Sequence, residues 1–115
     1  MFHVQNQRFE ELVAEALDEL PEELSRHIEN LAIIIEDHAS GRPLYGLYEG
    51  IPLTRRGPMS YSAVMPDRIT LFQATISRGC ENEDQVRAQV VRTLIHEVAH
   101  HFGISDPRLE ELGWA

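Results

Sequence analysis

The histidines at positions 96 and 100 are the residues whose type and spacing can do chemistry. They belong to the segment His96-Glu97-Val98-Ala99-His100, which has the pattern HExxH. In an α-helix, residues four apart are separated by about 40° around the axis and about 6 Å along it. Two imidazoles at this spacing project from one face and can bind a single tetrahedral ion. The spacing therefore predicts that His96 and His100 bind a metal such as zinc.

Glu97 lies about 100° around the same helix from His96, which does not suit it as a third ligand. It lies instead beside the open coordination position of the metal, where a carboxylate can take a proton from water. The pattern therefore predicts Glu97 as the general base of a hydrolase. A pair of core histidines that bind no metal is the alternative interpretation.

A third protein ligand is expected, because catalytic zinc sites usually have three protein ligands and one water. The chain continues past His100 with His101-Phe102-Gly103-Ile104-Ser105-Asp106. Gly103 permits the helix to end and the chain to turn back. Asp106 is then the expected third ligand, with Glu110 and Glu111 as alternatives. Gly and Asp at these offsets lower the chance frequency of the motif by a factor of about 200, which favours the metal site over core histidines.

The residues HEVAHHFGISD resemble the extended zinc-binding signature of zincin metallopeptidases, which metzincins carry with His, or in some relatives Asp, at the last position. The whole chain, including LAIIIED, LYGLYEGIPL and MPDRITLF, is similar to the small bacterial zincin-like metallopeptidase family. The resemblance implies one α+β domain over residues 1–115. Its fold would be a minimal zincin fold, with N-terminal helices and a C-terminal HExxH helix packed on a small mixed β-sheet.

The resemblance also implies the activity, which is zinc-dependent hydrolysis of a peptide or protein substrate. His96, His100 and Asp106 would hold Zn²⁺, and Glu97 would act as general base on a water activated by the metal. Metzincins have a Met-containing turn and a lower subdomain after the signature, whereas residues 107–115 are all that follow here. We therefore expect the lower wall of the cleft to be absent or supplied by a partner chain.

Two other functions fit the same residues. A non-catalytic metal-binding or partner-binding module would have the zincin fold without turnover, and the acidic face of the first helix would be its docking surface. A structural zinc site would unfold the domain when the metal is removed. Glu97 argues against a structural site, because such a site needs no base.

Several other side chains are weighed as site residues. His101 lies about 140° around the helix from His96 and cannot share its ion, so it either contacts the transition-state oxyanion or packs. Three tyrosines can offer a hydroxyl to the oxyanion and are otherwise core or rim aromatics: Tyr45, Tyr48 and Tyr61. His38 and Cys80 are expected to be structural.

Helices and strands must position these residues. Apolar side chains from Phe9 to Leu20 recur every three or four positions, which predicts a first helix, and Pro21 suits the start of a second over 22–30. Strands are expected at 31–35, 44–48, 61–64 and 68–73, the first of them buried. The segment 61–64, or the loop before it, is the expected substrate-binding edge. A long helix is predicted from 82–84 to Phe102, largely buried between the sheet and the N-terminal helices, with Gly103 at positive φ.

The composition sets the class of protein. The 115 residues are 43% hydrophobic and 25% charged, which suits one small globular domain. The net charge of -9 disfavours nucleic acid as a partner. The single cysteine excludes an internal disulfide and a multi-cysteine zinc site. No apolar run approaches the roughly 20 residues of a membrane helix, and the N-terminal residues lack the features of a signal peptide, so a cytoplasmic location without membrane contact is expected.

Overall fold

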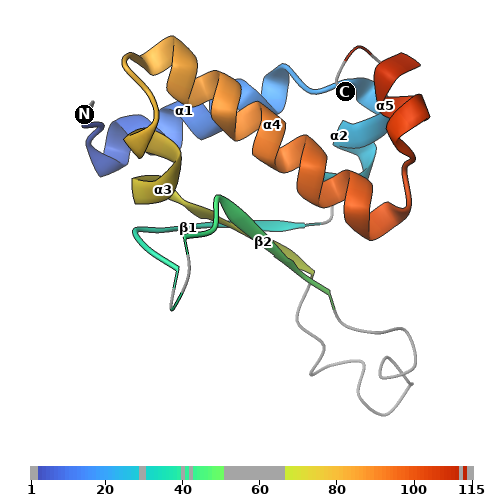
Figure 1. Cartoon of the computed structure of the whole chain (residues 1–115), viewed down its shortest axis with the longest axis horizontal. Helices are drawn as coiled ribbons and strands as arrows, with labels where there is room; N and C mark the ends of the chain where they lie inside the picture. Colours follow the sequence, from blue (N-terminus) through green and yellow to red (C-terminus); the bar gives the residue numbers. More distant parts are fainter. Residues whose placement is uncertain are drawn as a thin grey trace.

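Helices and a small sheet form the structure, a computed structural model that describes residues 3–28, 31–39, 41, 43–50, 67–111 and 113 (Figure 1). The described elements, in chain order, are α1 (Asn6–Asp18), α2 (Glu22–Ile28), β1 (Ala32–Glu36), β2 (Gly46–Glu49), β3 (Arg68–Phe72), α3 (Gln73–Arg78), α4 (Glu83–Phe102) and α5 (Asp106–Glu111). The expected α+β class is confirmed, and the arrangement is compatible with a minimal zincin fold. None of the described helices is both long enough and apolar enough to cross a membrane.

The sheet is mixed, and β3 lies at its centre. The strand order is β1-β3-β2, with β1 parallel and β2 antiparallel to β3. The register pairs Ala32 with Arg68 in the parallel ladder and Gly46 with Leu71 in the antiparallel one. The predicted strand at 31–35 is present as β1, but the prediction that it is buried is wrong. It is an edge strand of the described sheet, and the side chains of 32–35 are half-buried. The predicted strand at 61–64 lies outside the described residues.

The helix α4 is the centre of the core. In Figure 1 it runs along the sheet, with α1 and α2 on the side away from the strands. Its apolar residues are enclosed from both sides, which confirms the predicted position between the sheet and the N-terminal helices. The residues with no exposed surface come from all these elements and include Phe9, Leu12, Leu24, Ile69, Leu71, Val90, Leu94 and Val98.

Both ends of α4 lie where the sequence predicts them. At the start, the Asn82 side chain accepts a hydrogen bond of 2.9 Å from the Gln85 backbone N–H, which satisfies a helix-terminal donor. At the end, Gly103 has φ +70°, a left-handed conformation that is costly for other residues. The Ile104 N–H then donates to the Ala99 carbonyl at 2.9 Å. The chain therefore leaves α4 in a defined direction immediately after the HExxH segment.

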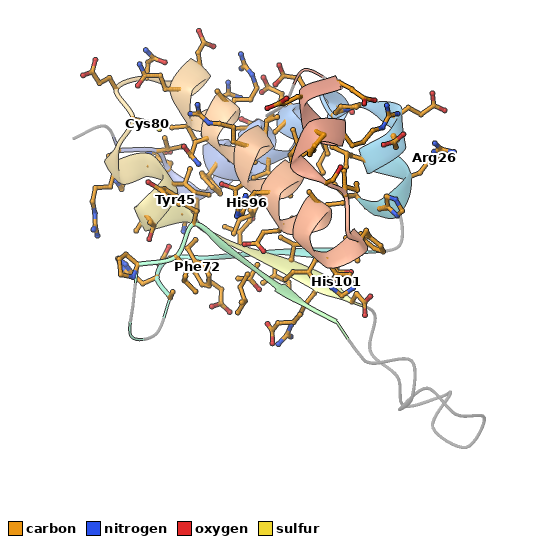
Figure 2. All side chains as sticks on the ribbon, turned by 45° about the vertical axis from the view of Figure 1, so that its right-hand side comes forward. Arg26, Tyr45, Phe72, Cys80, His96 and His101 are labelled. Atoms are coloured by element: carbon orange, nitrogen blue, oxygen red, sulfur yellow. The ribbon has the colours of Figure 1, made fainter. Side chains whose placement is uncertain are left out.

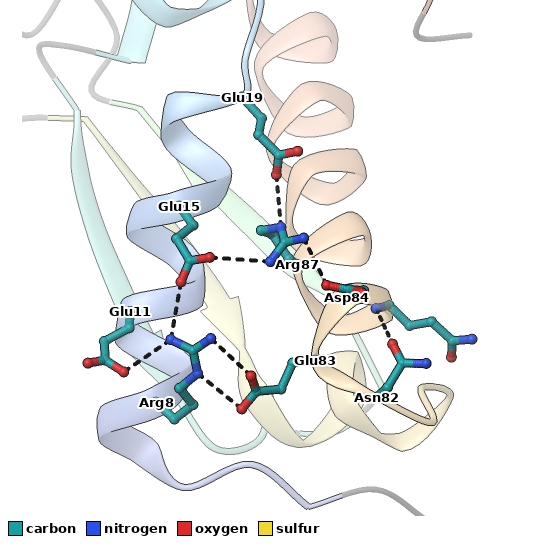
Figure 3. A network of polar contacts seen from close by, with 9 residues as sticks. Arg8, Glu11, Glu15, Glu19, Asn82, Glu83, Asp84 and Arg87 are labelled. Carbon is teal, nitrogen blue, oxygen red and sulfur yellow. Dashed lines mark hydrogen bonds and ion pairs between the residues drawn. The ribbon is translucent and has the colours of Figure 1, made fainter.

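Ion pairs connect the acidic face of α1 to the first turns of α4 (Figure 3). The Arg8 guanidinium donates to both oxygens of Glu83 at 2.9 and 3.0 Å. These hydrogen bonds lower the pKa of the Glu83 carboxyl below its usual value. Arg8 and Arg87 also bind carboxylates of α1, of the residue after it and of α4: Glu11, Glu15, Glu19 and Asp84. Part of the acidic face that the binding-module alternative needs as a docking surface is therefore paired within the chain.

Two short helices complete the described chain. The predicted strand at 68–73 ends one residue early, at Phe72, and Gln73 begins α3. The sequence pattern does not predict α3, because only six residues form it and only one of its buried residues, Ile76, is a large apolar one. The helix α5 begins at Asp106, and its residue Leu109 is buried. This packing holds the segment after Gly103 against the rest of the domain.

Candidate functional site

The HExxH residues lie on one uninterrupted stretch of α4, which extends from Glu83 to Phe102. Positions 96 and 100 are therefore one helical turn apart, as the spacing predicts. The His96 side chain is exposed and the Glu97 side chain is half-buried. Figure 2 shows His96 on the side of α4 that faces the sheet, close to Tyr45.

A hollow of about 360 Å³ lies between α4 and the chain that leads into β2. It is lined by Pro43, Leu44, Tyr45, Gly46, Gln89, Arg92, Thr93, His96 and Glu97. The predicted ligand His96, the predicted base Glu97 and the oxyanion candidate Tyr45 thus border the same space. Tyr45 is 49% exposed, which places it at the rim rather than in the core. A hollow of this size can accept a side chain of a bound peptide beside the candidate base.

Gly46 allows β2 to approach α4 at this hollow. A Cβ atom at Gly46 would lie 2.7 Å from Cγ2 of Thr93, 3.3 Å from the Thr70 carbonyl oxygen and 3.7 Å from Cγ of Glu97. The Thr93 hydroxyl donates to the Gln89 carbonyl at 2.8 Å, which holds the methyl group in place. Gly46 is not among the site residues predicted from the sequence. An isolated glycine inside a predicted strand is the available signal, because it often marks close backbone approach.

For the other two predicted ligands, the structure gives the position of the backbone. His100 follows His96 by one turn of α4, and Asp106 is the first residue of α5, beyond the Gly103 turn. The side chains of both residues lie outside the described part of the structure. Among the described side chains, no three metal-ligating groups come together. The alternative ligands Glu110 and Glu111 are exposed on α5, where the Glu111 carboxylate accepts a hydrogen bond of 2.7 Å from Arg108.

The arrangement fits a zinc ion in three respects. A regular helix carries both histidine positions, the His96 imidazole is at the surface beside a hollow, and the chain turns back after α4 toward a carboxylate residue. Imidazole and carboxylate ligands are those that zinc accepts in catalytic sites. These are the side-chain types of His96, His100 and Asp106, whose role as zinc ligands stays a prediction.

An aromatic cluster at the end of α4 accounts for two other candidates. The Tyr48 and His101 rings stack with centroids 3.7 Å apart, and the Tyr48 hydroxyl donates to Asp67 at 3.1 Å. Phe102 contacts the edge of the His101 ring and stacks on His27 of α2 at 4.2 Å. These contacts favour the packing interpretation of Tyr48 and His101 over a contact with the oxyanion. The third tyrosine candidate, Tyr61, lies outside the described residues.

The remaining candidates lie away from the hollow. Cys80 is buried, its thiol donates to the Ile76 carbonyl at 3.2 Å, and burial raises the pKa of this thiol. A buried thiol with a raised pKa is a poor nucleophile, in agreement with the structural role expected for Cys80. His38 is exposed just after β1.

Comparison with known proteins bears on both the fold and the family. A solved structure described as a conserved hypothetical protein from Thermo thermophilus has the same fold, with a TM-score of 0.55, 23% sequence identity and coverage of 95% of this chain and 97% of that one. No curated protein matches the chain. The sequence profile of the zincin-like metallopeptidases matches residues 28–114, about three quarters of the chain. The chain therefore belongs to the zincin-like metallopeptidase family.

Proposed function

We propose that this protein is a zinc-dependent metallopeptidase in which His96, His100 and Asp106 hold the metal and Glu97 is the general base. One observation carries the proposal: the side chains of His96 and Glu97 border one hollow next to a strand at the edge of the described sheet. Membership in the zincin-like metallopeptidase family supports it.

The reaction would be hydrolysis of a peptide bond by water. When bound, zinc supplies a Lewis acid that polarises the scissile carbonyl and lowers the pKa of water. Glu97 takes a proton from the attacking water and delivers it to the nitrogen of the leaving amine as the C–N bond breaks. Tyr45, which lies at the rim of the same hollow, would donate its phenolic hydrogen to the carbonyl oxygen as negative charge develops there.

The substrate would bind in an extended conformation along β2. In the described sheet β2 pairs with β3 on one side, so its other side can accept the backbone of a peptide. We propose β2 as this edge, because it contacts α4 and its first residue lines the hollow, whereas the expected edge at 61–64 lies outside the described residues. Gly46 sets the distance between this strand and the turn of α4 that carries Glu97.

The test combines zinc content with peptide hydrolysis, each measured on the full chain. Glu97→Gln should retain one zinc per chain and lose turnover by roughly 10²–10⁴-fold, the usual contribution of a general base. His96→Ala should lose zinc, and Asp106→Ala should weaken zinc binding. Glu10→Gln is the matched control, because it makes the same chemical change on an exposed carboxylate of α1.

Three results would contradict the proposal. Unchanged hydrolysis by Glu97→Gln would exclude Glu97 as the base. Bound zinc without hydrolysis of casein or of a peptide library would favour a non-catalytic metal-binding module instead. Unfolding of the whole domain on metal removal, followed by circular dichroism, would indicate a structural site.

A further inference from the structure

We infer that the hollow beside His96 and Glu97 binds a carboxylate group of the peptide, and that Arg92 recognises this group. The inference rests on the proposed function, because it assigns the substrate class of the same site. Arg92 precedes His96 by four residues on α4, so the two side chains project from the same face of the helix about 6 Å apart along its axis. Both line the hollow.

Arg92 is the arginine of this lining and, like Arg26 and Arg78, it forms no ion pair among the described residues. Four other arginines form ion pairs with carboxylates: Arg8, Arg68, Arg87 and Arg108. Among the described residues, Arg92 forms no ion pair and makes one long hydrogen bond, 3.3 Å from its guanidinium to Oε1 of Gln89. A guanidinium presents five N–H donors in a planar fork that matches the two oxygens of a carboxylate. Most donors of Arg92 therefore remain available to a ligand.

The Gln89 contact directs the Arg92 side chain toward the candidate site. Arg92 lies between two hollows on the surface of α4, the one beside His96 and a second one lined by Glu19 and Asp84. Its hydrogen-bond partner Gln89, however, lines the hollow of His96 and not the second one. Within the described part of the chain, the guanidinium therefore has its one hydrogen bond to a residue of the His96 hollow.

The rest of the lining suits the side chain of an acidic residue. Pro43, Leu44 and Tyr45 offer apolar surface for its methylene groups, and Arg92 is the cation among the described residues that line the hollow. Glu97 is the acid in this lining, and Arg92 offsets the repulsion that its carboxylate would exert on an anionic ligand. A carboxylate can come from an Asp or Glu side chain or from the C-terminus of a peptide, so both sources must be compared.

Peptide binding measured in the absence of turnover tests the inference. Fluorescein-labelled decapeptides of Ala, Gly and Ser, with one Glu or one Gln at each position in turn and with a free or amidated C-terminus, are titrated against zinc-loaded Glu97→Gln protein. Fluorescence anisotropy gives the dissociation constants. The same titrations are made with Arg92→Gln and with Arg26→Gln, both in the Glu97→Gln background. Arg26 is the matched control, because it is exposed on α2, outside the lining of the hollow (Figure 2).

We expect Glu at one position to bind roughly fivefold more tightly than Gln, near the upper limit for an exposed ion pair. Arg92→Gln should abolish this ratio, and Arg26→Gln should preserve it. A ratio that instead follows the free C-terminus identifies that carboxylate as the ligand and supports the inference equally. Equal binding of Glu and Gln peptides, no binding of either, or a ratio that survives Arg92→Gln would overturn the inference.

The binding experiment can refute the carboxylate site without refuting the proposed peptidase, and the hydrolysis experiment can refute the peptidase without refuting the carboxylate site. Binding that depends on Arg92, together with no hydrolysis by the zinc-loaded wild-type chain, would refute the peptidase and retain the carboxylate site. Hydrolysis by the wild-type chain without discrimination between Glu and Gln peptides would support the peptidase and refute the carboxylate site.

Discussion

The contact between Gly46 and Thr93 supports a sharp test of how β2 is held against α4. A Cβ atom at position 46 would lie 2.7 Å from Cγ2 of Thr93, whereas carbon atoms in optimal contact are about 3.5–4.0 Å apart. Gly46→Ala therefore requires a displacement of about 0.8 Å or more. The Thr93 methyl cannot rotate away without breaking the hydrogen bond from its hydroxyl to the Gln89 carbonyl. The Thr70 carbonyl limits movement on the other side, at 3.3 Å.

The expected cost follows from two opposing effects. Overpacking a close contact destabilises the folded state by about 1–3 kcal/mol. Alanine also lowers the conformational entropy of the unfolded chain, which favours the folded state by up to about 1 kcal/mol. We therefore expect Gly46→Ala to lower the free energy of unfolding by about 1–2 kcal/mol, measured by urea denaturation. Gly79→Ala is the matched control, because a Cβ there meets nothing within 4 Å and the glycine has φ of -92°.

A second substitution tests the identity of the clashing atom. Thr93→Ser removes Cγ2 and keeps the hydroxyl, and alone it should cost about 1 kcal/mol for the lost buried methyl group. In the double variant with Gly46→Ala, the new methyl occupies the space of the one removed. The double variant should therefore be more stable than the sum of the single effects by about 1 kcal/mol or more. Additive effects, or a Gly46→Ala variant as stable as Gly79→Ala, would refute the close packing of β2 on α4.

Two further predictions concern the start of α4. Glu83→Gln should lower stability at pH 7. Arg8 lowers the pKa of Glu83 in the folded state, so the contribution of Glu83 to stability is complete above the unfolded pKa of about 4.3 and is lost as the pH falls through the lower folded pKa. The urea midpoints of wild type and Glu83→Gln should therefore converge as the pH falls below the unfolded pKa, with Glu10→Gln as control. A difference that stays constant with pH would contradict this linkage. Asn82→Ala should cost about 1 kcal/mol through the lost hydrogen bond to the Gln85 N–H, and an unchanged urea midpoint would show that the cap contributes nothing.

Local patterns in the sequence predicted the elements that carry the site. The apolar arc of α4, its Asn82 cap and its Gly103 terminus are all within-helix features, and each is confirmed. The same holds for the buried face of α1, where Phe9, Leu12, Val13 and Ala16 recur at helical spacing. The short helix α3 escaped prediction, because tertiary packing rather than an amphipathic pattern supports its six residues.

Burial within the sheet could not be predicted in the same way. The run LAIII suggested a buried strand, yet β1 is half-buried while RITLF forms the buried central strand. Strand order decides this difference, because a central strand is covered on both edges by its neighbours. Pairing between Ala32 and Arg68 joins positions far apart in the chain, and no local pattern contains that information.

The sequence by itself determined the chemistry available to this protein and the helix that carries it, because HExxH spacing and helical periodicity are local properties of consecutive residues. The roles of His96, Glu97, His100 and Asp106 remain predictions from that pattern. Only the tertiary structure decided that His96 and Glu97 share a hollow with Tyr45 and Arg92. The physical reason is the close approach of β2 to α4 at Gly46. This approach is possible because glycine has no Cβ atom that would collide with Thr70 and Thr93, which lie 24 and 47 positions further along the chain.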